Sequence, residues 1–154
     1  MARGQRIGVF GGSFNPPHDG HRLVAEAALR RLGLQRIWWL VTPGNPLKEN
    51  RDLPSQPDRM AACRALMHDP RMVITGIEAS IGTVYTQQTI AWLRRRLPGV
   101  RLVWIMGADS LAGFHRWQRW KSLAKAVPIV VVDRPGATLS AKVAPAARWL
   151  ARVR

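Results

Sequence analysis

The densest group of residues able to do chemistry lies near the amino terminus, in the run GGSFNPPHDGH at positions 11–21. Two glycines open the run and, lacking Cβ atoms, let a backbone turn tightly and approach a ligand. His18 and His21 lie three residues apart where a helix is expected to begin, so their rings can project to one side. The helix N-terminus adds free N–H groups and a partial positive charge. The run therefore predicts a phosphate cradle with two histidine donors.

Other interpretations of this run are available. It is neither the GxGxxG dinucleotide fingerprint nor a Walker loop, because the lysine and the glycine spacing of both are missing. Two histidines can contribute to a metal site, but no third ligand lies nearby in the sequence, so we predict no protein-bound metal. A structural turn whose histidines cap the helix stays open beside the phosphate cradle.

The elements that must position this run follow a regular alternation of short apolar segments and helical periodicity, which favours β-α units and a parallel sheet. The expected strands are 6–10, 36–41, 72–75, 102–106 and 128–132, and the expected helices are 19–32, 57–68, 86–97 and 144–153. A turn is expected from Gly11 to Pro17, a loop over 42–57, and a polar segment after the fourth strand that ends near Ser122. The fold class is therefore α/β, a doubly wound Rossmann-like parallel sheet of about five strands whose ligands lie at the carboxyl ends of the strands.

Several buried positions can also be predicted. Leu23, Ala27 and Leu32 are expected near one face of the first helix, with Gly33 as its end. The paired tryptophans 38 and 39 lie inside a strand, which favours the core or a sheet face. Cys63, in an amphipathic helix, is expected to be a small buried hydrophobe.

Length and composition limit the class of protein. The chain has 154 residues, of which 47% are hydrophobic and 21% charged, and this predicts a single domain over 1–154 with a real core. No apolar run approaches the roughly 20 residues needed to span a bilayer, and the first residues lack the apolar region of a signal peptide. One cysteine excludes an internal disulfide framework and a multi-cysteine zinc site. A reducing, cytoplasmic location without membrane contact is the expectation.

The charge balance is strongly basic, with 24 Lys and Arg against 9 Asp and Glu and a formal net charge of +15. Such a field favours polyanions, either nucleic acid or nucleotide phosphates. The basic residues are scattered, with the densest run at 94–96, and form no long basic tail. A nucleic-acid-binding module is therefore the distant alternative, and solvated helix faces are the favoured explanation of the charge.

Four blocks of the sequence resemble one family. GGSFNPPHDGH at 11–21 resembles the signature of the nucleotidyltransferases with HxGH motifs, and its Asn-Pro-Pro form is most similar to the bacterial nicotinate-nucleotide adenylyltransferases. TVYTQQT at 83–89 resembles the TYT-type segment of that family, and IMGADSL at 105–111, followed by Phe114 and Trp117, resembles its GADSL…F…W block. VDRPG at 132–136 resembles its Arg-Pro-Gly turn. The blocks occur in the family's order and span nearly the whole chain.

The resemblance implies a reaction in which nicotinate mononucleotide and ATP give deamido-NAD and pyrophosphate. The phosphate of the mononucleotide attacks the α-phosphorus of ATP in line, and Mg²⁺ bridges phosphate oxygens with few or no protein ligands. It implies that His18 and His21 are the catalytic residues, which bind triphosphate oxygens and stabilise charge in the transition state. The implied ATP- and phosphate-binding residues are Gly11, Gly12, Ser13, Phe14, Lys48, Gly107, Asp109 and Arg134. The implied mononucleotide-binding residues are Thr83, Tyr85, Thr86 and Trp117.

Individual roles follow from the same resemblance. Ser13 and Phe14 offer backbone N–H groups to phosphate, Asp109 accepts a hydrogen bond from a ribose hydroxyl, and Trp117 stacks on the pyridine ring. The family continues with a further strand and a Ser/Thr-rich ISSTxxR-type segment, which this sequence does not contain, and we expect weaker ATP binding and catalysis without it. Alternatives within the superfamily are another HxGH adenylyltransferase, such as pantetheine-phosphate adenylyltransferase, and a catalytically weak nucleotide-binding form. The preference for acid or amide and a homo-oligomeric state stay open.

Overall fold

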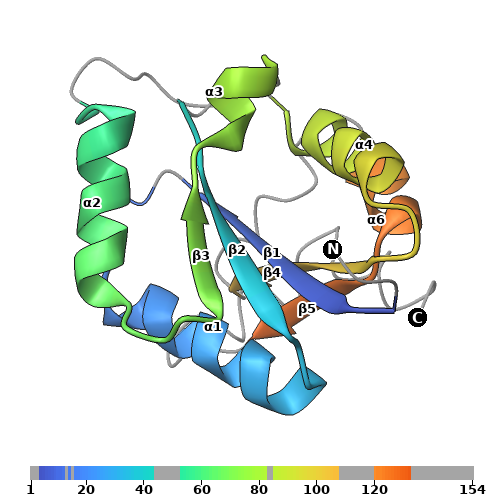
Figure 1. The fold of residues 1–154 in the computed structure, drawn as a ribbon, viewed down its shortest axis with the longest axis horizontal. Coiled ribbons are helices and arrows are strands. Elements are labelled where there is room, and N and C mark those ends of the chain that lie inside the picture. Colours follow the sequence, from blue (N-terminus) through green and yellow to red (C-terminus); the bar gives the residue numbers. More distant parts are fainter. Residues whose placement is uncertain are drawn as a thin grey trace.

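The computed structural model describes residues 4–12, 14, 16–43, 53–82, 85–107 and 120–132. Within them, five strands form one sheet in the order β3-β2-β1-β4-β5, and every neighbouring pair is parallel (Figure 1). The strands are β1 (Arg6–Gly12), β2 (Arg36–Val41), β3 (Met72–Thr75), β4 (Arg101–Gly107) and β5 (Ile129–Val132). The helices are α1 (Asp19–Leu32), α2 (Gln56–Leu66), α3 (Ile77–Ile81), α4 (Thr86–Arg96) and α6 (Trp120–Ala126). The predicted fold class, a Rossmann-like parallel sheet of about five strands, is confirmed.

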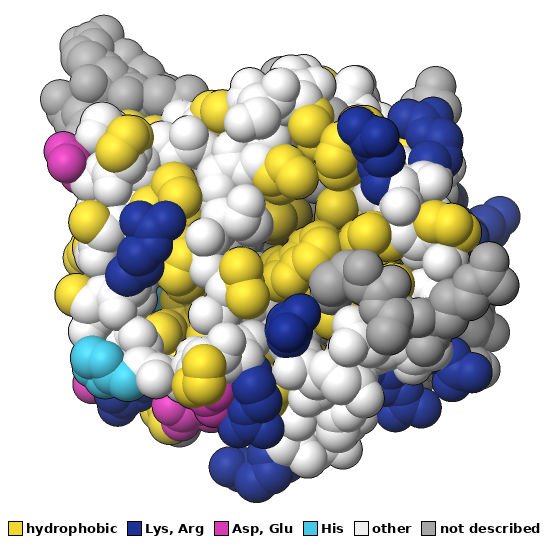
Figure 2. All heavy atoms as spheres, in the orientation of Figure 1, with side chains coloured by type: hydrophobic (Ala, Val, Ile, Leu, Met, Phe, Trp, Pro, Cys, Tyr) yellow, Lys and Arg dark blue, Asp and Glu magenta, His cyan; other side chains and the backbone are white. Residues whose placement is uncertain are grey.

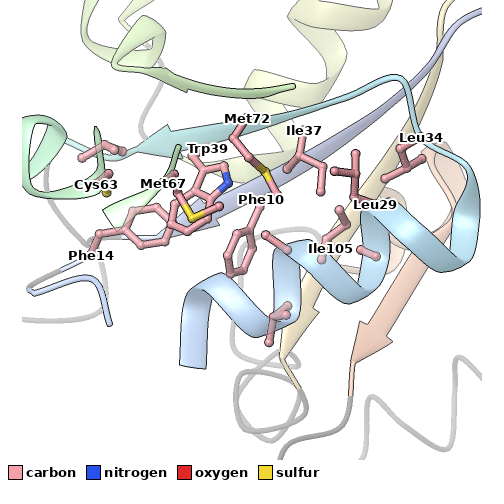
Figure 3. Close-up of a cluster of buried hydrophobic side chains, with 14 residues drawn as sticks. Phe10, Phe14, Leu29, Leu34, Ile37, Trp39, Cys63, Met67, Met72 and Ile105 are labelled. Carbon is pink, nitrogen blue, oxygen red and sulfur yellow. The ribbon is translucent and has the colours of Figure 1, made fainter. Parts of the chain in front are cut away.

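Helices cover both faces of the sheet because side chains alternate along each strand. In β1, Ile7 and Val9 join the core on the side of α4 and α6, where Ile90 and Leu93 of α4 lie. Phe10 points to the other side, where α1 and α2 pack over the sheet (Figure 3). Because the central strands are apolar on both faces, they are buried as the continuous apolar runs of the sequence predict.

The ends of two helices are set by local sequence signals. Gly33 follows α1 with φ 60°, a left-handed conformation that glycine adopts without steric cost, and its N–H donates to the carbonyl of Leu29. Ser55 caps α2 by accepting a hydrogen bond from the Asp58 N–H at 3.2 Å, and a proline occupies the first turn of the helix, as predicted for Pro57.

Several expectations need correction. β1 continues through Gly12, so the turn does not begin at Gly11. The face predicted for α1 is wrong, because Leu23 is 60% exposed, and the face in contact with the sheet is instead formed by Val24, Ala25, Ala28 and Leu29. The short helix α3 was not expected, and α6 forms where a polar segment was predicted. The expected closing helix 144–153 lies outside the described residues.

Other buried positions agree with the sequence. Trp39 and Cys63 are fully buried and Trp38 is half-buried. The Lys and Arg side chains on the face in Figure 2 are spread between apolar and neutral groups and form no continuous basic patch there. In the part of the chain that the structure describes, no helix has both the length and the apolar character needed to cross a membrane.

Gly11 has a packing role that its sequence context does not reveal. A Cβ built at Gly11 would lie 2.5 Å from Cη2 of Trp104, and this indole is buried in the core on the α4 side. Because a ring cannot yield as the end of a flexible side chain can, a methyl group at this position requires the sheet or the indole to shift.

We therefore expect Gly11→Ala to lower the free energy of unfolding by about 1–3 kcal/mol through overpacking. Urea denaturation checks this in a double-mutant cycle with Trp104→Leu. If the Cβ–indole contact is the cause, Gly11→Ala costs much less in the Trp104→Leu background than in the wild type. Equal costs in both backgrounds would contradict this explanation.

Candidate functional site

The predicted histidine loop lies at the edge of the sheet where its strands end. β1 ends at Gly12 and α1 begins at Asp19, so the chain leaves the centre of the sheet and at once starts the helix (Figure 1). β2, on one side of β1, and β4, on the other, run parallel to it. In sheets of this kind, ligands bind outside the carboxyl ends of the strands.

His18 and His21 form a reciprocal pair at the N-terminus of α1. The Gly20 N–H donates to Nδ1 of His18 at 3.0 Å, and the His18 N–H donates to Nδ1 of His21 at 3.1 Å. Both Nδ1 atoms are acceptors, so each neutral ring carries its proton on Nε2. The two ring centroids are 4.0 Å apart with the planes tilted by 37°. The bonds fix both the tautomer and the direction of each imidazole.

The loop is anchored to the core by Phe14, whose role as a side chain the sequence did not suggest. Phe14 is only 2% exposed although its backbone has φ 50°, a left-handed conformation that is uncommon for a residue with a Cβ. Its ring contacts Phe10 and Trp39 at centroid distances of 5.5 and 5.1 Å (Figure 3), and it also contacts His21 at 5.0 Å. Burial in this aromatic cluster offsets the strained backbone.

Gly12 makes room for that anchor. A Cβ at Gly12 would lie 3.3 Å from Cζ of Phe14, which is tighter than ordinary contact. The two glycines of the motif therefore serve packing, Gly11 beneath an indole and Gly12 beside a phenyl ring. Their contact with phosphate stays a prediction.

The arrangement is suited to binding an anion. The N-terminus of α1 supplies peptide N–H groups and a partial positive charge. The two imidazoles add N–H donors in a fixed direction, because their other nitrogens are used by the backbone. The cap and the phosphate cradle, which the sequence left as alternatives, are therefore compatible, since they use different nitrogens of the same rings.

Arg59 holds the chain where it leaves β2, and sequence reasoning missed it. The guanidinium is 3% exposed and donates to three carbonyl oxygens: from Nε to Pro54 at 2.8 Å, from Nη1 to Thr42 at 2.7 Å and from Nη2 to Pro43 at 3.2 Å. It thus joins the segment after β2 to the segment before α2. Burial lowers the pKa of this guanidinium. An arginine on an otherwise apolar helix face was the only signal in the sequence.

Burial also shifts the pKa of the neighbouring cysteine. Cys63 lies one turn further along α2, and burial raises the pKa of its thiol to about 11, against smaller opposite effects of Arg59 and Arg64. A thiol with that pKa is protonated at neutral pH, so Cys63 is not a nucleophile. The prediction that it is a buried hydrophobe is confirmed.

A buried carboxyl lies beyond the end of β3. Glu78 of α3 is 4% exposed and accepts a hydrogen bond at 2.7 Å from the hydroxyl of Thr89 on α4. Burial raises the pKa of the Glu78 carboxyl, and the bond from Thr89 lowers it by less. The pair joins α3 to the first turn of α4, where the predicted mononucleotide-binding residues Tyr85 and Thr86 lie.

The predicted site residues divide into two groups. Gly11, Gly12, Phe14, His18 and His21 meet at the β1–α1 crossing, and Gly107 ends the neighbouring strand β4. Tyr85 caps the N-terminus of α4, where its N–H donates to Oε1 of Gln88 at 3.2 Å, and Thr86 is the first helical residue. The remaining predicted residues, Ser13, Lys48, Thr83, Asp109, Trp117 and Arg134, lie outside the described residues.

Comparison with known proteins defines the class. The chain matches the family model described as cytidylyltransferase-like over residues 9–151. The parallel sheet and the histidine loop at the end of its first strand are thus those of a cytidylyltransferase-like nucleotidyltransferase.

Relatives narrow this class to one family. The chain is 59% identical over 134 residues to a probable nicotinate-nucleotide adenylyltransferase of Agrobacterium fabrum, with 87% of this chain and 72% of that protein covered. A protein of the same name from a Bradyrhizobium species is 58% identical over 149 residues, with 97% and 78% covered. The chain therefore belongs to the nicotinate-nucleotide adenylyltransferase family, as the four sequence blocks predict.

A solved structure supports the fold alone. The Plasmodium falciparum nicotinic acid mononucleotide adenylyltransferase complexed with NaAD aligns with a TM-score of 0.70 at 13% identity, covering 91% of this chain and 80% of that chain. At this identity the likeness extends to the arrangement of strands and helices and not to individual residues.

The Arg59 contacts predict a large loss of stability on truncation. Arg59→Met keeps most of the aliphatic stem but leaves the three carbonyl oxygens without their donor, and we expect a loss of roughly 2–4 kcal/mol in the free energy of unfolding. Arg64→Met, at an exposed position of the same helix, is the matched control and should change it by less than about 0.5 kcal/mol. Equal urea midpoints for the two variants would contradict the role of Arg59.

The raised pKa of Glu78 predicts a pH-dependent stability. Because the folded-state pKa lies above the unfolded value, the carboxyl favours folding when protonated, and this contribution is lost as pH rises through the folded pKa. Wild type should therefore gain stability relative to Glu78→Gln, which does not titrate, as pH falls from neutral toward the ordinary pKa of a glutamate carboxyl. Thermal melts of both proteins in the same buffers test this, and a difference that is constant with pH would contradict it.

Proposed function

We propose that this chain transfers the adenylyl group of ATP to nicotinate mononucleotide, with deamido-NAD and pyrophosphate as products, in NAD biosynthesis. Two independent facts support the proposal. The family is that of the nicotinate-nucleotide adenylyltransferases. The single observation on the chain itself that carries it is the reciprocal pair His18–His21 at the N-terminus of α1, because this arrangement suits phosphate oxygens.

The chemistry asks for positioning and for neutralisation of charge. A phosphate oxygen of the mononucleotide forms a bond to the α-phosphorus of ATP, and the bond from that phosphorus to the β-phosphate bridging oxygen breaks. The electron pair leaves with pyrophosphate. The attacking phosphate is already an anion, so no general base and no covalent enzyme intermediate are needed. Binding the two anions in line is the task of the protein.

His18 and His21 perform the electrostatic part of this task. With Nδ1 used by the backbone, each ring presents Nε2–H as its donor, and we assign these two groups to oxygens of the triphosphate. The donors are held before substrate arrives, so little reorganisation accompanies the build-up of charge in the transition state. The first peptide N–H groups of α1 act in the same direction.

Mg²⁺ is the ion that we assign to the reaction, bound through phosphate oxygens of the substrate. Among the described residues no group of three or more His, Cys, Asp and Glu side chains could hold a metal. Such an ion neutralises charge on the triphosphate and on the departing pyrophosphate.

We also propose roles for the other predicted residues around the histidine pair. On the ATP side we assign backbone N–H groups of Ser13 and Phe14, close backbone approach at Gly11, Gly12 and Gly107, and the side chains of Lys48, Asp109 and Arg134. On the mononucleotide side we assign Thr83, Tyr85, Thr86 and Trp117. The tryptophan stacks on the pyridine ring, and backbone N–H groups bind the nicotinate carboxylate. The whole chain, 1–154, acts as one domain.

The histidine assignment can be separated from the helix cap. Asparagine places Oδ1 close to the position of the imidazole Nδ1, but it has nothing at the position of Nε2; at position 18, which is the N-cap of α1, it is also a preferred residue. We expect His18→Asn and His21→Asn to keep the thermal stability of the wild type while each lowers the rate of pyrophosphate release by about 10²–10³-fold.

His18→Ala and His21→Ala serve as the comparison, since they remove both nitrogens and should cost about 1 kcal/mol of stability as well as activity. Steady-state assays with ATP, Mg²⁺ and nicotinate mononucleotide, together with thermal melts, give both readouts. Asparagine variants with wild-type rates would overturn the role of Nε2 in the reaction.

A further inference from the structure

The burial of Glu78 is unusual for a charged residue in so short a helix. The helix α3 has five residues, Ile77–Ile81, yet it buries a carboxyl at 4% exposure. Oε2 accepts the Thr89 hydroxyl at 2.7 Å, whereas the buried Oε1 has no hydrogen-bond partner among the described residues. Burial of a carboxyl with one unsatisfied oxygen is costly, so packing alone does not explain a glutamate at this position.

The bond spans the connection between α3 and α4. Thr89 lies in the first turn of α4, and the Tyr85 carbonyl accepts from the N–H groups of Gln88 at 3.0 Å and of Thr89 at 3.3 Å. The Thr89 hydroxyl lies 3.5 Å from the same carbonyl, so its short bond to Glu78 sets its direction. A shift of Glu78 would therefore be transmitted directly to the turn that contains Tyr85 and Thr86.

The described ends of α3 do not themselves tie it to α4. Gly76 precedes α3 and provides no side-chain cap, and Gly82 ends the helix with φ 73°. The Ile77 N–H donates to Oγ1 of Thr75, which ties α3 back to β3 and not to α4. The Glu78–Thr89 bond, in contrast, joins the two helices directly.

We propose that Glu78 is a positioning residue for the mononucleotide site and acts through Thr89 on the first turn of α4. The inference rests on the proposed function, in which Tyr85 and Thr86 bind nicotinate mononucleotide. The phosphate site is built separately, since the core cluster that holds Phe14 contains residues of α1, α2 and the sheet but none of α3 or α4. Loss of the bond should therefore affect the two substrates unequally.

The test uses the full chain and two pairs of variants. Glu78→Ala and Thr89→Val remove the bond from either side, while Glu78→Gln and Thr89→Ser keep an acceptor and a hydroxyl. With pyrophosphate release as the assay, we expect the first pair to raise KM for nicotinate mononucleotide by about 10-fold and to leave KM for ATP within about 2-fold. The conservative pair should stay within about 3-fold of the wild type in both.

A control separates positioning from general loss of stability. Ile90→Val removes one methyl group from the same helix, at a buried position without a hydrogen bond, and lowers the melting temperature without touching the pair. It should leave the ratio of the two KM values unchanged. Equal changes in both KM values in Glu78→Ala or Thr89→Val, or a wild-type KM for the mononucleotide, would overturn the proposal.

Direct binding distinguishes this proposal from the proposed function. Quenching of tryptophan fluorescence by nicotinate mononucleotide gives a Kd that needs no turnover. If the wild type binds the mononucleotide but releases no pyrophosphate, the adenylyl-transfer proposal fails, and weaker binding by Thr89→Val than by Thr89→Ser still supports the role of Glu78. Equal Kd values for that pair would overturn it, as would a wild type that does not bind the mononucleotide.

Discussion

The hydrogen bonds between His18, His21 and the backbone at the start of α1 set the orientation of the two imidazole rings on which the candidate site depends. Each Nδ1 accepts a peptide N–H, so the proton of each neutral ring is on Nε2. For this pair to exist, the loop that leads from the end of β1 to the start of α1 must be held in place. Phe14 pins it from inside the aromatic cluster, at the cost of a left-handed backbone and of a glycine beside its ring. The packing of α1 on the sheet then sets the direction of the helix N-terminus.

Buried polar residues also hold the connections that follow β2 and β3. The buried polar or charged residues of the described chain are Arg59, Glu78 and Thr89. Arg59 fixes the chain after β2, and Glu78 with Thr89 fixes the two helices that follow β3. Burial of these polar groups is unfavourable by itself, and in each case it accompanies a hydrogen bond that holds a connection following a strand. Polar burial thus occurs where the segments around the candidate site must be held, and the remainder of the core is apolar.

Much of this could be predicted from local sequence, and the rest depends on contacts between distant residues. Apolar runs predicted all five strands, and GGSFNPPHDGH predicted a loop and a helix with histidines at its start, although its two glycines belong to β1. The packing roles of Gly11 and Phe14 depend on Trp104 and Trp39, which lie far away in sequence. Glu78 carries no signal in its own window, because a charged residue in a short helix ordinarily faces solvent. For Arg59 the only signal is its place on an otherwise apolar helix face. The face of α1 was misjudged because Leu23 and Val24 are adjacent, and only the approach of the sheet decides which one is buried.

The most direct measurement is pyrophosphate release by the wild-type chain from ATP and Mg²⁺, with nicotinate mononucleotide, with its amide, and with neither. We predict release that requires a mononucleotide and saturates with it, because the proposed function assigns the phosphates of ATP to the histidine pair and the mononucleotide to the first turn of α4. Absence of release with either mononucleotide, from a protein that shows a cooperative thermal transition, would contradict the assignment of this site to adenylyl transfer.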